Sequence, residues 1–201
     1  MAAAVRLILA SASPRRAQLL AQIGVTHEVM PAQLIERRET GESIVACVQR
    51  LAESKARQVR ERLRTAEREP VLVLGADTAV ALDGRMLGKP RDERDGLEML
   101  ANLSARTHEV LSAVALADAG GVRSALSVSQ VRLRAITPDE AARYWASGEP
   151  HDKAGAYAIQ GRGAIFVQAL QGSYSGVMGL PLFETAWLLE QAGVPLWGAS
   201  G

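Results

Sequence analysis

Near the start of the chain, the pattern of apolar and polar positions changes from one period to another. Arg6 to Ala10 is a short apolar run, and Pro14 to Ile23 repeats apolar residues at helical spacing until Gly24. This pattern predicts a strand, a tight turn and a helix. Glu28 to Met30 is expected to form a second, short strand.

The middle of the chain carries one long helical pattern and one long apolar run. The segment from Ser43 to about Glu67 places its apolar residues on one face, which predicts a helix. Val71 to Val80 is almost continuously apolar, as is typical of a strand that is buried on both faces. Asp83-Gly84 follows it and predicts a hairpin turn.

The second half of the chain alternates helical and strand-like segments. We expect helices at Asp92 to Leu103, Thr137 to Ser147 and Leu182 to Ala192, strands at Thr107 to Ala117, Val122 to Leu133 and about Ala164 to Leu170, and a glycine-rich loop at Gly155 to Gly163. Segments that alternate in this way, together with strands joined by tight turns, predict an α/β fold with a mixed twisted sheet flanked by helices.

Composition narrows the class of protein. The chain has 201 residues, 48% hydrophobic and 22% charged, with a formal net charge of +1. These values describe a soluble globular protein, and we expect one domain over residues 1–201. The near-neutral charge gives no support for nucleic-acid binding.

Cysteine and histidine usage bears on metals and on location. The single Cys47 cannot form an internal disulfide, and the three histidines are scattered, so any metal is expected to have oxygen ligands. Cys47 itself is expected in the core. No apolar run reaches the roughly 20 residues that span a bilayer, and Met1 to Ala10 lacks the features of a signal peptide. We therefore expect a cytoplasmic protein that does not bind membranes.

The first predicted helix, Pro14 to Ile23, begins with an unusual arrangement of charge. Ser13-Pro14 is an ordinary helix start, in which the serine is expected to cap free N–H groups. Arg15 and Arg16 follow at the positive end of the helix dipole, where an acidic residue would be favoured by about 0.3–1 kcal/mol. A bound anion would remove this conflict, which indicates a phosphate site. The alternative, that both arginines point to solvent, stays open.

Two charged residues lie at positions where the pattern predicts a core. Asp77 interrupts the apolar strand; if that strand ends near Gly75, Asp77 lies at its carboxyl end, where open α/β sheets place ligands. Lys55 lies on the apolar stripe of its helix, where it should reach an anion. The alternatives are an aspartate that bonds backbone N–H groups and a lysine that extends to solvent at the edge of the stripe.

The remaining candidates lie in loops. Lys89, between Gly88 and Pro90, is held in a constrained turn and could face a phosphate. Glu36 is the best further acid for a metal or a water molecule, although an ion pair with a neighbouring arginine is an open alternative.

Five motifs together resemble the Maf family. They are Leu-Ala-Ser-Ala-Ser-Pro-Arg-Arg (residues 9–16), Gly-Ala-Asp-Thr (75–78), Gly-Lys-Pro-Arg-Asp (88–92), Asp-Lys-Ala-Gly-Ala-Tyr-Ala-Ile-Gln-Gly (152–161) and Gly-Leu-Pro-Leu (179–182). The resemblance covers nearly the whole chain. It implies a nucleotide cleft between two lobes and a pyrophosphatase that cleaves a nucleoside triphosphate into a monophosphate and pyrophosphate with a divalent metal, Mg²⁺ or Mn²⁺.

The resemblance also implies roles for individual residues. Asp77 would be the general base or would organise the metal, with Glu36 assisting the metal. The triphosphate would be held by Ser13, Arg16, Lys55 and Lys89. Phosphoryl transfer needs mainly positioning, charge neutralisation and an oriented water, which agrees with these residue types.

Two branches of the family differ at three positions. The branch that acts on 7-methyl-GTP carries Trp, Gln and Glu where this chain has Arg15, Thr78 and Gln160. A cationic methylated guanine suits an aromatic face and a carboxylate, whereas the Gln160 amide can both donate to and accept from a uracil or thymine edge. The chain therefore resembles the dTTP/UTP branch, and we expect a homodimer with that specificity. Broader turnover of noncanonical triphosphates such as ITP, or a nucleotide-binding regulator of cell division, are the alternatives.

Overall fold

A computed structural model describes residues 5–63 and 71–197 of the chain. Within them, one seven-stranded mixed sheet has the order β2-β1-β3-β5-β6-β7, with β4 paired to β3. The strands are β1 (Arg6–Leu9), β2 (Glu28–Val29), β3 (Val71–Leu82), β4 (Arg85–Leu87), β5 (Thr107–Asp118), β6 (Gly121–Leu133) and β7 (Val167–Gln171). The helices are α1 (Pro14–Gln22), α2 (Ile44–Leu63), α3 (Glu93–Leu103), α4 (Pro138–Ala146), α5 (Tyr174–Met178) and α6 (Leu182–Gln191). Three 3₁₀ turns, η1 (Glu149–Asp152), η2 (Ala154–Ala156) and η3 (Arg162–Phe166), lie between α4 and β7.

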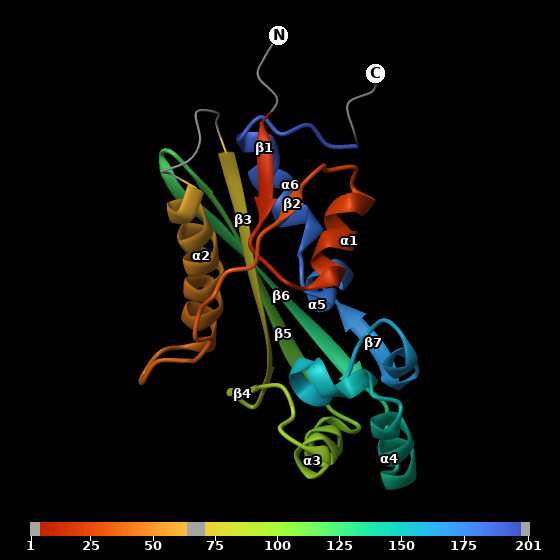
Figure 1. Cartoon of the computed structure of the whole chain (residues 1–201). Coiled ribbons are helices and arrows are strands. Elements are labelled where there is room, and N and C mark those ends of the chain that lie inside the picture. The colour runs from red at the N-terminus through yellow and green to blue at the C-terminus, as the bar shows by residue number, and fades with distance from the viewer. Residues whose placement is uncertain (1–4, 64–70, 198–201) are drawn as a thin grey trace.

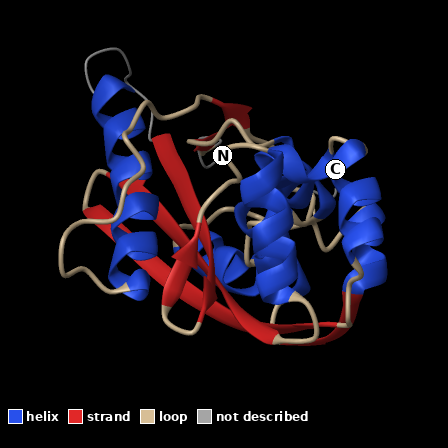
Figure 2. Cartoon of the chain, turned by 90° about the horizontal axis from the view of Figure 1, so that it is seen from below, coloured by secondary structure: helices blue, strands red, loops and turns tan. Residues whose placement is uncertain are grey.

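Helices cover both faces of the sheet (Figure 1). Alternate residues of β3 point to opposite faces: Val71 and Val73 pack in the core under α2, whereas Leu72 and Leu74 pack in the core under α1 and α6. This double burial explains why β3 is apolar at nearly every position. A third core cluster lies around α3, α4 and the 3₁₀ turns, at the other end of the long strands. The predicted α/β class, with a mixed sheet flanked by helices, is confirmed (Figure 2).

The close approach of α2 to β3 depends on Gly75. A Cβ atom at this position would lie 2.2 Å from the carbonyl oxygen of Ala52 and 2.8 Å from the amide nitrogen of Ala56. No other residue type leaves the space that these helix backbone atoms occupy. The glycine therefore lets the backbone of α2 rest directly on β3, two residues before Asp77 and against the helix turn that carries Lys55.

Most of the predicted elements are confirmed, with boundaries shifted by a few residues. The Asp83-Gly84 turn has φ values of 50° and 75°, as the predicted tight hairpin requires. Residues 64–67 of the predicted long helix, and residues 1–4, lie outside the described residues. The strand predicted from Ala164 begins only at Val167, because η3 occupies the preceding residues, and the short α5 was not predicted.

The strand predicted over Val71 to Val80 is confirmed as β3, so the condition that would place Asp77 at its carboxyl end, an end near Gly75, is not met. β3 continues to Leu82, because β5 pairs with it antiparallel from Val73 to Ala81. On its other edge β3 is paired with β1 only as far as Leu74, and with β4 only from Val80. Within the described part of the chain, residues 75–79 therefore have no strand partner on this edge. Asp77 lies in this gap, so it borders the carboxyl end of β1 although it is in the middle of its own strand.

Candidate active site

A cavity of about 780 Å³ opens at the gap between β1 and β4. Its walls come from the loop between β1 and α1, from α2 and β3, and from the segment around η1 and η2, so the cavity lies between the two ends of the molecule. Every site residue predicted from the sequence lines it: Ser13, Arg15, Arg16, Glu36, Lys55, Asp77, Thr78, Lys89 and Gln160.

Asp77 and Lys55 form a buried ion pair in the wall of this cavity. Lys55 Nζ lies 2.7 Å from Asp77 Oδ1, and each side chain is 7% exposed. The same ammonium lies 2.8 Å from Glu36 Oε1, whose side chain is 55% exposed. Lys55 thus reaches an anion, as its place on the apolar stripe predicted. The described partner of Glu36 is this lysine, so the alternative of an ion pair with Arg37 or Arg38 is wrong.

The environment of Asp77 makes its carboxylate more basic. Burial raises the pKa of Asp77, while the Lys55 ammonium and the Arg16 guanidinium oppose the rise by favouring the charged form. A carboxylate with a raised pKa that is still held by two cations is a stronger base than a solvent-exposed aspartate. It is therefore suited to accept a proton from a water molecule.

Arg16 points into the molecule and joins three segments of the chain. Its Nε donates to the Gly179 carbonyl at 2.7 Å, one terminal nitrogen donates to Ser11 Oγ at 3.1 Å, and the other donates to Thr78 Oγ1 at 3.4 Å. The alternative in which Arg16 extends to solvent is therefore wrong. Thr78 Oγ1 also lies 2.9 Å from Ser112 Oγ, so its side chain is fixed beside the guanidinium.

The start of α1 is capped differently from the starts of α3, α4 and α5. The N-cap side chains of α3, α4 and α5 each accept a backbone N–H bond. Ser13 occupies the N-cap position of α1, but its side chain makes no cap hydrogen bond, and the first turn carries no acidic residue. The predicted serine cap is therefore wrong. The first residues of α1 line the cavity, so this helix end borders it without that side-chain acceptor. Such an end favours an anion.

Gln160 also lines the cavity, in the segment that follows η2. Its Oε1 atom is buried and has no hydrogen-bond partner within residues 5–63 and 71–197. A buried acceptor without a partner costs about 1–3 kcal/mol, so a ligand that donates a hydrogen bond to it would recover that free energy. Arg15 and Thr78, the other two positions that distinguish the branches, line the same cavity.

Several lining residues escaped the sequence analysis. Glu149 carries no periodic signal, and Asp152, Lys153 and Tyr157 stand out in the sequence only as members of the motif at 152–161. Lys153 donates to the neighbouring Asp152, and this bond and the positive charge lower the pKa of Asp152. A buried or paired role for such loop residues becomes visible only when the loop is folded.

The donor set near Asp77 fits a hard divalent cation. No group of three or more histidine, cysteine or acidic residues with metal-binding geometry occurs in the described residues. Asp77 and Glu36 nevertheless converge on one ammonium nitrogen, so the position between them already favours positive charge. Mg²⁺ is commonly bound through one or two carboxylates, with water and substrate phosphates as its other ligands. Two carboxylates beside an open cavity match this arrangement.

Comparison with known proteins identifies the family of this chain. The family model described as Maf-like protein matches residues 6–192. The chain belongs to the Maf family. It is 51% identical over 191 residues to a dTTP/UTP pyrophosphatase of Saccharophagus degradans, covering 95% of this chain and 90% of that protein. It is 49% identical over 200 residues to a dTTP/UTP pyrophosphatase of Aromatoleum aromaticum, covering 95% of this chain and 97% of that protein. A third dTTP/UTP pyrophosphatase, from Methylococcus capsulatus, is 51% identical over 190 residues, which cover 94% of this chain and 92% of that Maf relative.

Proposed function

We propose that this Maf protein is a nucleoside triphosphate pyrophosphatase that hydrolyses dTTP and UTP to the monophosphate and pyrophosphate. Two features of one cavity carry the proposal: a buried carboxylate beside two cations, and a buried amide oxygen that has no hydrogen-bond partner among the described residues. The first arrangement suits hydrolysis of a phosphate anhydride, and the second suits a base with an N–H donor. The names of the relatives that are about 50% identical support the same activity.

The triphosphate is bound by the cationic side of the cavity. Arg16 and the start of α1, which lacks a side-chain cap, neutralise charge at one end of the triphosphate. The exposed Lys89 lines the same cavity next to β4. Ser13 contributes a hydroxyl that its own helix does not use. Lys55 bonds Asp77 and Glu36 and so couples the phosphate-binding side to the two carboxylates.

Asp77 acts as the general base. It takes a proton from a water molecule that attacks phosphorus, and the anhydride bond between the α and β phosphates breaks with pyrophosphate as the leaving group. The raised pKa of Asp77 favours this proton transfer, and the bond from Lys55 holds the carboxylate in one orientation. Glu36 and Asp77 would hold a divalent cation, Mg²⁺ or Mn²⁺, which neutralises charge on the phosphate oxygens when it is bound.

Gln160 reads the base. Its Oε1 accepts from the ring N–H of uracil or thymine, and its amide nitrogen donates to an adjacent ring carbonyl. Thr78 is fixed against Arg16, and Arg15 lines the wall where the other branch of the family carries an aromatic ring. These three residues thus select a neutral pyrimidine over a cationic purine.

The activity is tested by pyrophosphate release from a panel of nucleoside triphosphates with Mg²⁺ or Mn²⁺. We expect dTTP and UTP to have the highest kcat/KM. Comparable turnover of ITP and other purine triphosphates would instead identify a broader noncanonical triphosphate pyrophosphatase. Nucleotide binding without turnover would identify a regulator, such as a cell-division factor.

The role of Asp77 is tested by Asp77→Asn, which is nearly isosteric. We expect a loss of at least roughly 10²-fold in turnover with the fold retained, because the base is removed. Circular dichroism provides the folding control. A folded variant with near-normal turnover would contradict the assignment.

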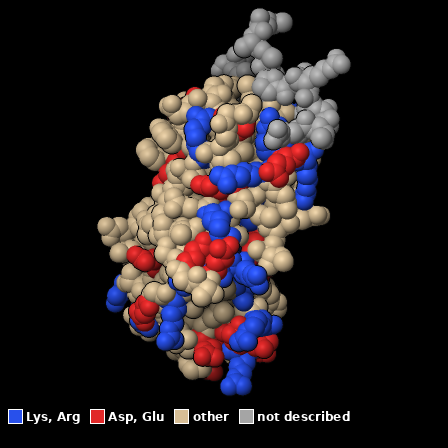
Figure 3. Space-filling model, turned by 90° about the vertical axis from the view of Figure 1, so that its left-hand side faces the viewer, with Lys and Arg blue, Asp and Glu red and all other residues tan. Residues whose placement is uncertain are grey.

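Three further expectations belong with this proposal. We expect the single domain to be a homodimer in the cytoplasm, as the resemblance and the composition predict. None of the helices in the described residues is long and apolar enough to cross a membrane. Lys, Arg, Asp and Glu are interspersed on the side that carries α2 (Figure 3). Light scattering tests the oligomeric state, and cell fractionation tests the location.

A further inference from the structure

A carboxylate and a phenol hold the loop that carries Gln160. Glu149 Oε1 accepts from the Tyr144 hydroxyl at 2.8 Å and from the Gly163 N–H at 2.9 Å. Glu149 Oε2 accepts from the Arg162 N–H at 2.9 Å. The Tyr144 oxygen in turn accepts from the Ala158 N–H at 3.1 Å. Backbone amides on both sides of Gln160 are therefore bound to one pair of side chains.

Two glycines in this loop allow the side chains to come so close. A Cβ atom at Gly161 would lie 2.4 Å from Glu149 Oε2, and the glycine has a φ of 94°, which L residues rarely adopt. A Cβ atom at Gly163 would lie 2.5 Å from the Tyr144 hydroxyl. The loop therefore follows the surface of this pair with no space for a side chain between them.

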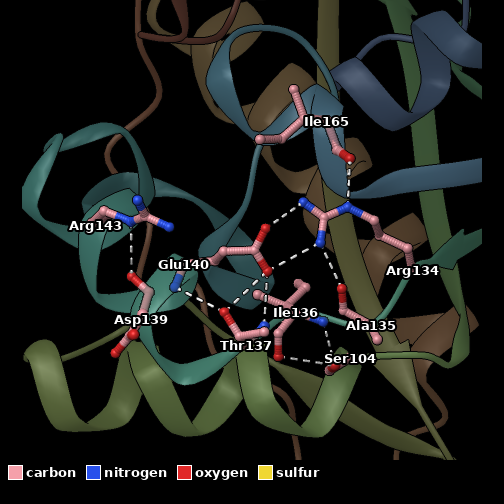
Figure 4. A network of polar contacts seen from close by, with 9 residues as sticks. All are labelled: Ser104, Arg134, Ala135, Ile136, Thr137, Asp139, Glu140, Arg143 and Ile165. Carbon is pink, nitrogen blue, oxygen red and sulfur yellow. Dashed lines mark hydrogen bonds and ion pairs between the residues drawn. The ribbon is translucent and has the colours of Figure 1, made fainter.

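The far end of the loop is fixed by a separate network (Figure 4). Arg134 Nε donates to the Ile165 carbonyl at 3.1 Å, and Glu140 holds the Arg134 guanidinium. The Arg134 N–H also donates to the Phe166 carbonyl at 2.8 Å. These bonds fix residues 165 and 166, and the His108 ring binds the Tyr157 hydroxyl at 2.8 Å before Gln160. Between these two points, Glu149 and Tyr144 bind the backbone amides on both sides of Gln160.

Glu149 lines the cavity, but its oxygens are already engaged by three donors. Burial favours a higher pKa for Glu149, yet the Arg162 and Gly163 N–H groups and the Tyr144 hydroxyl outweigh it, so the pKa lies below its ordinary value. The group is therefore an ionised acceptor for the loop. This use distinguishes it from Asp77 and Glu36, which face the ammonium of Lys55.

We propose that Glu149 and Tyr144 are positioning residues for base selection, which fix the backbone on both sides of Gln160 and so aim its amide at the pyrimidine. This inference rests on the proposed function, because it assigns the origin of the base specificity of that site. Neither residue needs to contact the substrate for this role. What they supply is a loop that is already ordered before the nucleotide binds.

The first test measures the loop in the protein without nucleotide. Amide hydrogen exchange is followed by NMR in the wild type, in Glu149→Gln and in Tyr144→Phe. We expect the Arg162 or Gly163 amides in Glu149→Gln, and the Ala158 amide in Tyr144→Phe, to exchange about 10-fold faster or more, because each variant weakens or removes the acceptor of these amides. Tyr144→Phe keeps the edge contact with Phe166 and removes only the hydroxyl. Unchanged exchange in both variants would overturn the proposal, whatever the enzyme hydrolyses.

The second test separates base reading from triphosphate binding. We expect Glu149→Gln to lower kcat/KM for UTP about 10-fold, while the inhibition constant of inorganic tripolyphosphate, measured with the same divalent metal, stays within about twofold. In a Gln160→Ala background, Glu149→Gln should have little further effect on UTP, because the group that it positions is gone. Equal losses for UTP and tripolyphosphate, or losses that multiply in the double variant, would overturn the proposal.

A matched control has the same acid-to-amide change at a distant turn. Asp118 accepts from the Gly120 N–H at 2.7 Å and from Arg123 at 3.0 Å, at the turn between β5 and β6. Asp118→Asn should leave both kinetic values unchanged. A wild type that releases no pyrophosphate from UTP would refute the proposed function, and the exchange experiment alone would then decide the role of Glu149 and Tyr144.

Discussion

Replacement of Lys55 by methionine should strongly destabilise the fold, although the substitution makes the core more apolar. Lys55 and Asp77 are each 7% exposed and their charged atoms lie 2.7 Å apart. Removal of one partner from a buried ion pair leaves the other charge without compensation and costs about 3–5 kcal/mol. We expect the lower end of this range, because Arg16 still interacts with the Asp77 carboxylate.

Two companion variants determine where the cost arises. Asp77→Asn should cost less, because Lys55 keeps its ion pair with Glu36 at 2.8 Å. The double variant Lys55→Met, Asp77→Asn should be more stable than Lys55→Met alone, because no buried carboxylate is left unpaired. Arg57→Met is the control on the same helix, since Arg57 is exposed and pairs only with Glu53 in the described structure. Exposed pairs of this kind contribute about 0–1 kcal/mol.

The cost of Lys55→Met should also depend on pH. Without the ammonium, the described residues leave Arg16 to oppose the effects of burial and of the Glu36 charge, so the pKa of Asp77 rises further. A carboxyl with a raised pKa binds its proton more tightly in the folded state than in the unfolded state. The free energy of unfolding therefore falls as the pH rises from the ordinary aspartate pKa through the raised value. The substitution should cost less at about pH 5 than at about pH 8.

Urea unfolding followed by circular dichroism at these two pH values measures the effect. Equal m values would show that the variants unfold to a comparable state. The reasoning is refuted if Lys55→Met costs no more than Arg57→Met, or if its cost is the same at both pH values. Either result would mean that Asp77 is not an anion held in the core by Lys55.

The remaining predictions concern specificity, packing and acid stability. Gln160→Glu replaces the amide with a carboxylate that only accepts hydrogen bonds, so kcat/KM for dTTP and UTP should fall, with a loss of roughly 1–3 kcal/mol in transition-state binding. The kcat/KM for 7-methyl-GTP should fall less or rise. An equal change for all three substrates would show that Gln160 does not read the base. Gly75→Ala places a methyl group 2.2 Å from the Ala52 carbonyl oxygen and should lower the free energy of unfolding by about 1–3 kcal/mol in urea titrations, with an unchanged value speaking against the close packing of α2 on β3. Burial lowers the pKa of His108 to about 4, so the unfolded state binds its proton first and stability should fall by up to about 3 kcal/mol as the pH drops from 6.5 to 4. A His108→Gln variant with the same pH dependence as the wild type would contradict this.

The positions of most helices, strands and turns could be predicted because residues close in sequence determine them. The helix start at Ser13-Pro14, the hairpin turn at Asp83-Gly84 and the apolar run that became β3 each depend on neighbouring residues. The unusual charges were also visible in the sequence, because Asp77 and Lys55 break apolar patterns that the surrounding residues establish. The phosphate site that we propose at the start of α1 was indicated in the same way, by Arg15 and Arg16 at the positive end of a helix.

The tertiary structure decided what these charges contact and where the cavity opens along the central strand. Asp77 borders the cavity because, in the described residues, β1 pairs with β3 only as far as Leu74 and β4 only from Val80, and no pattern within β3 reveals this gap. Lys55 meets Asp77 because the missing side chain of Gly75 lets α2 rest on the strand. The hydrogen bonds from the loop to Glu149 likewise come from residues that lie 13 and 14 positions further along the chain. The donors are backbone N–H groups, which nearly every residue has, so the sequence does not reveal them. Periodicity identifies a buried charge, but only packing over long sequence separations brings its partner within hydrogen-bonding distance.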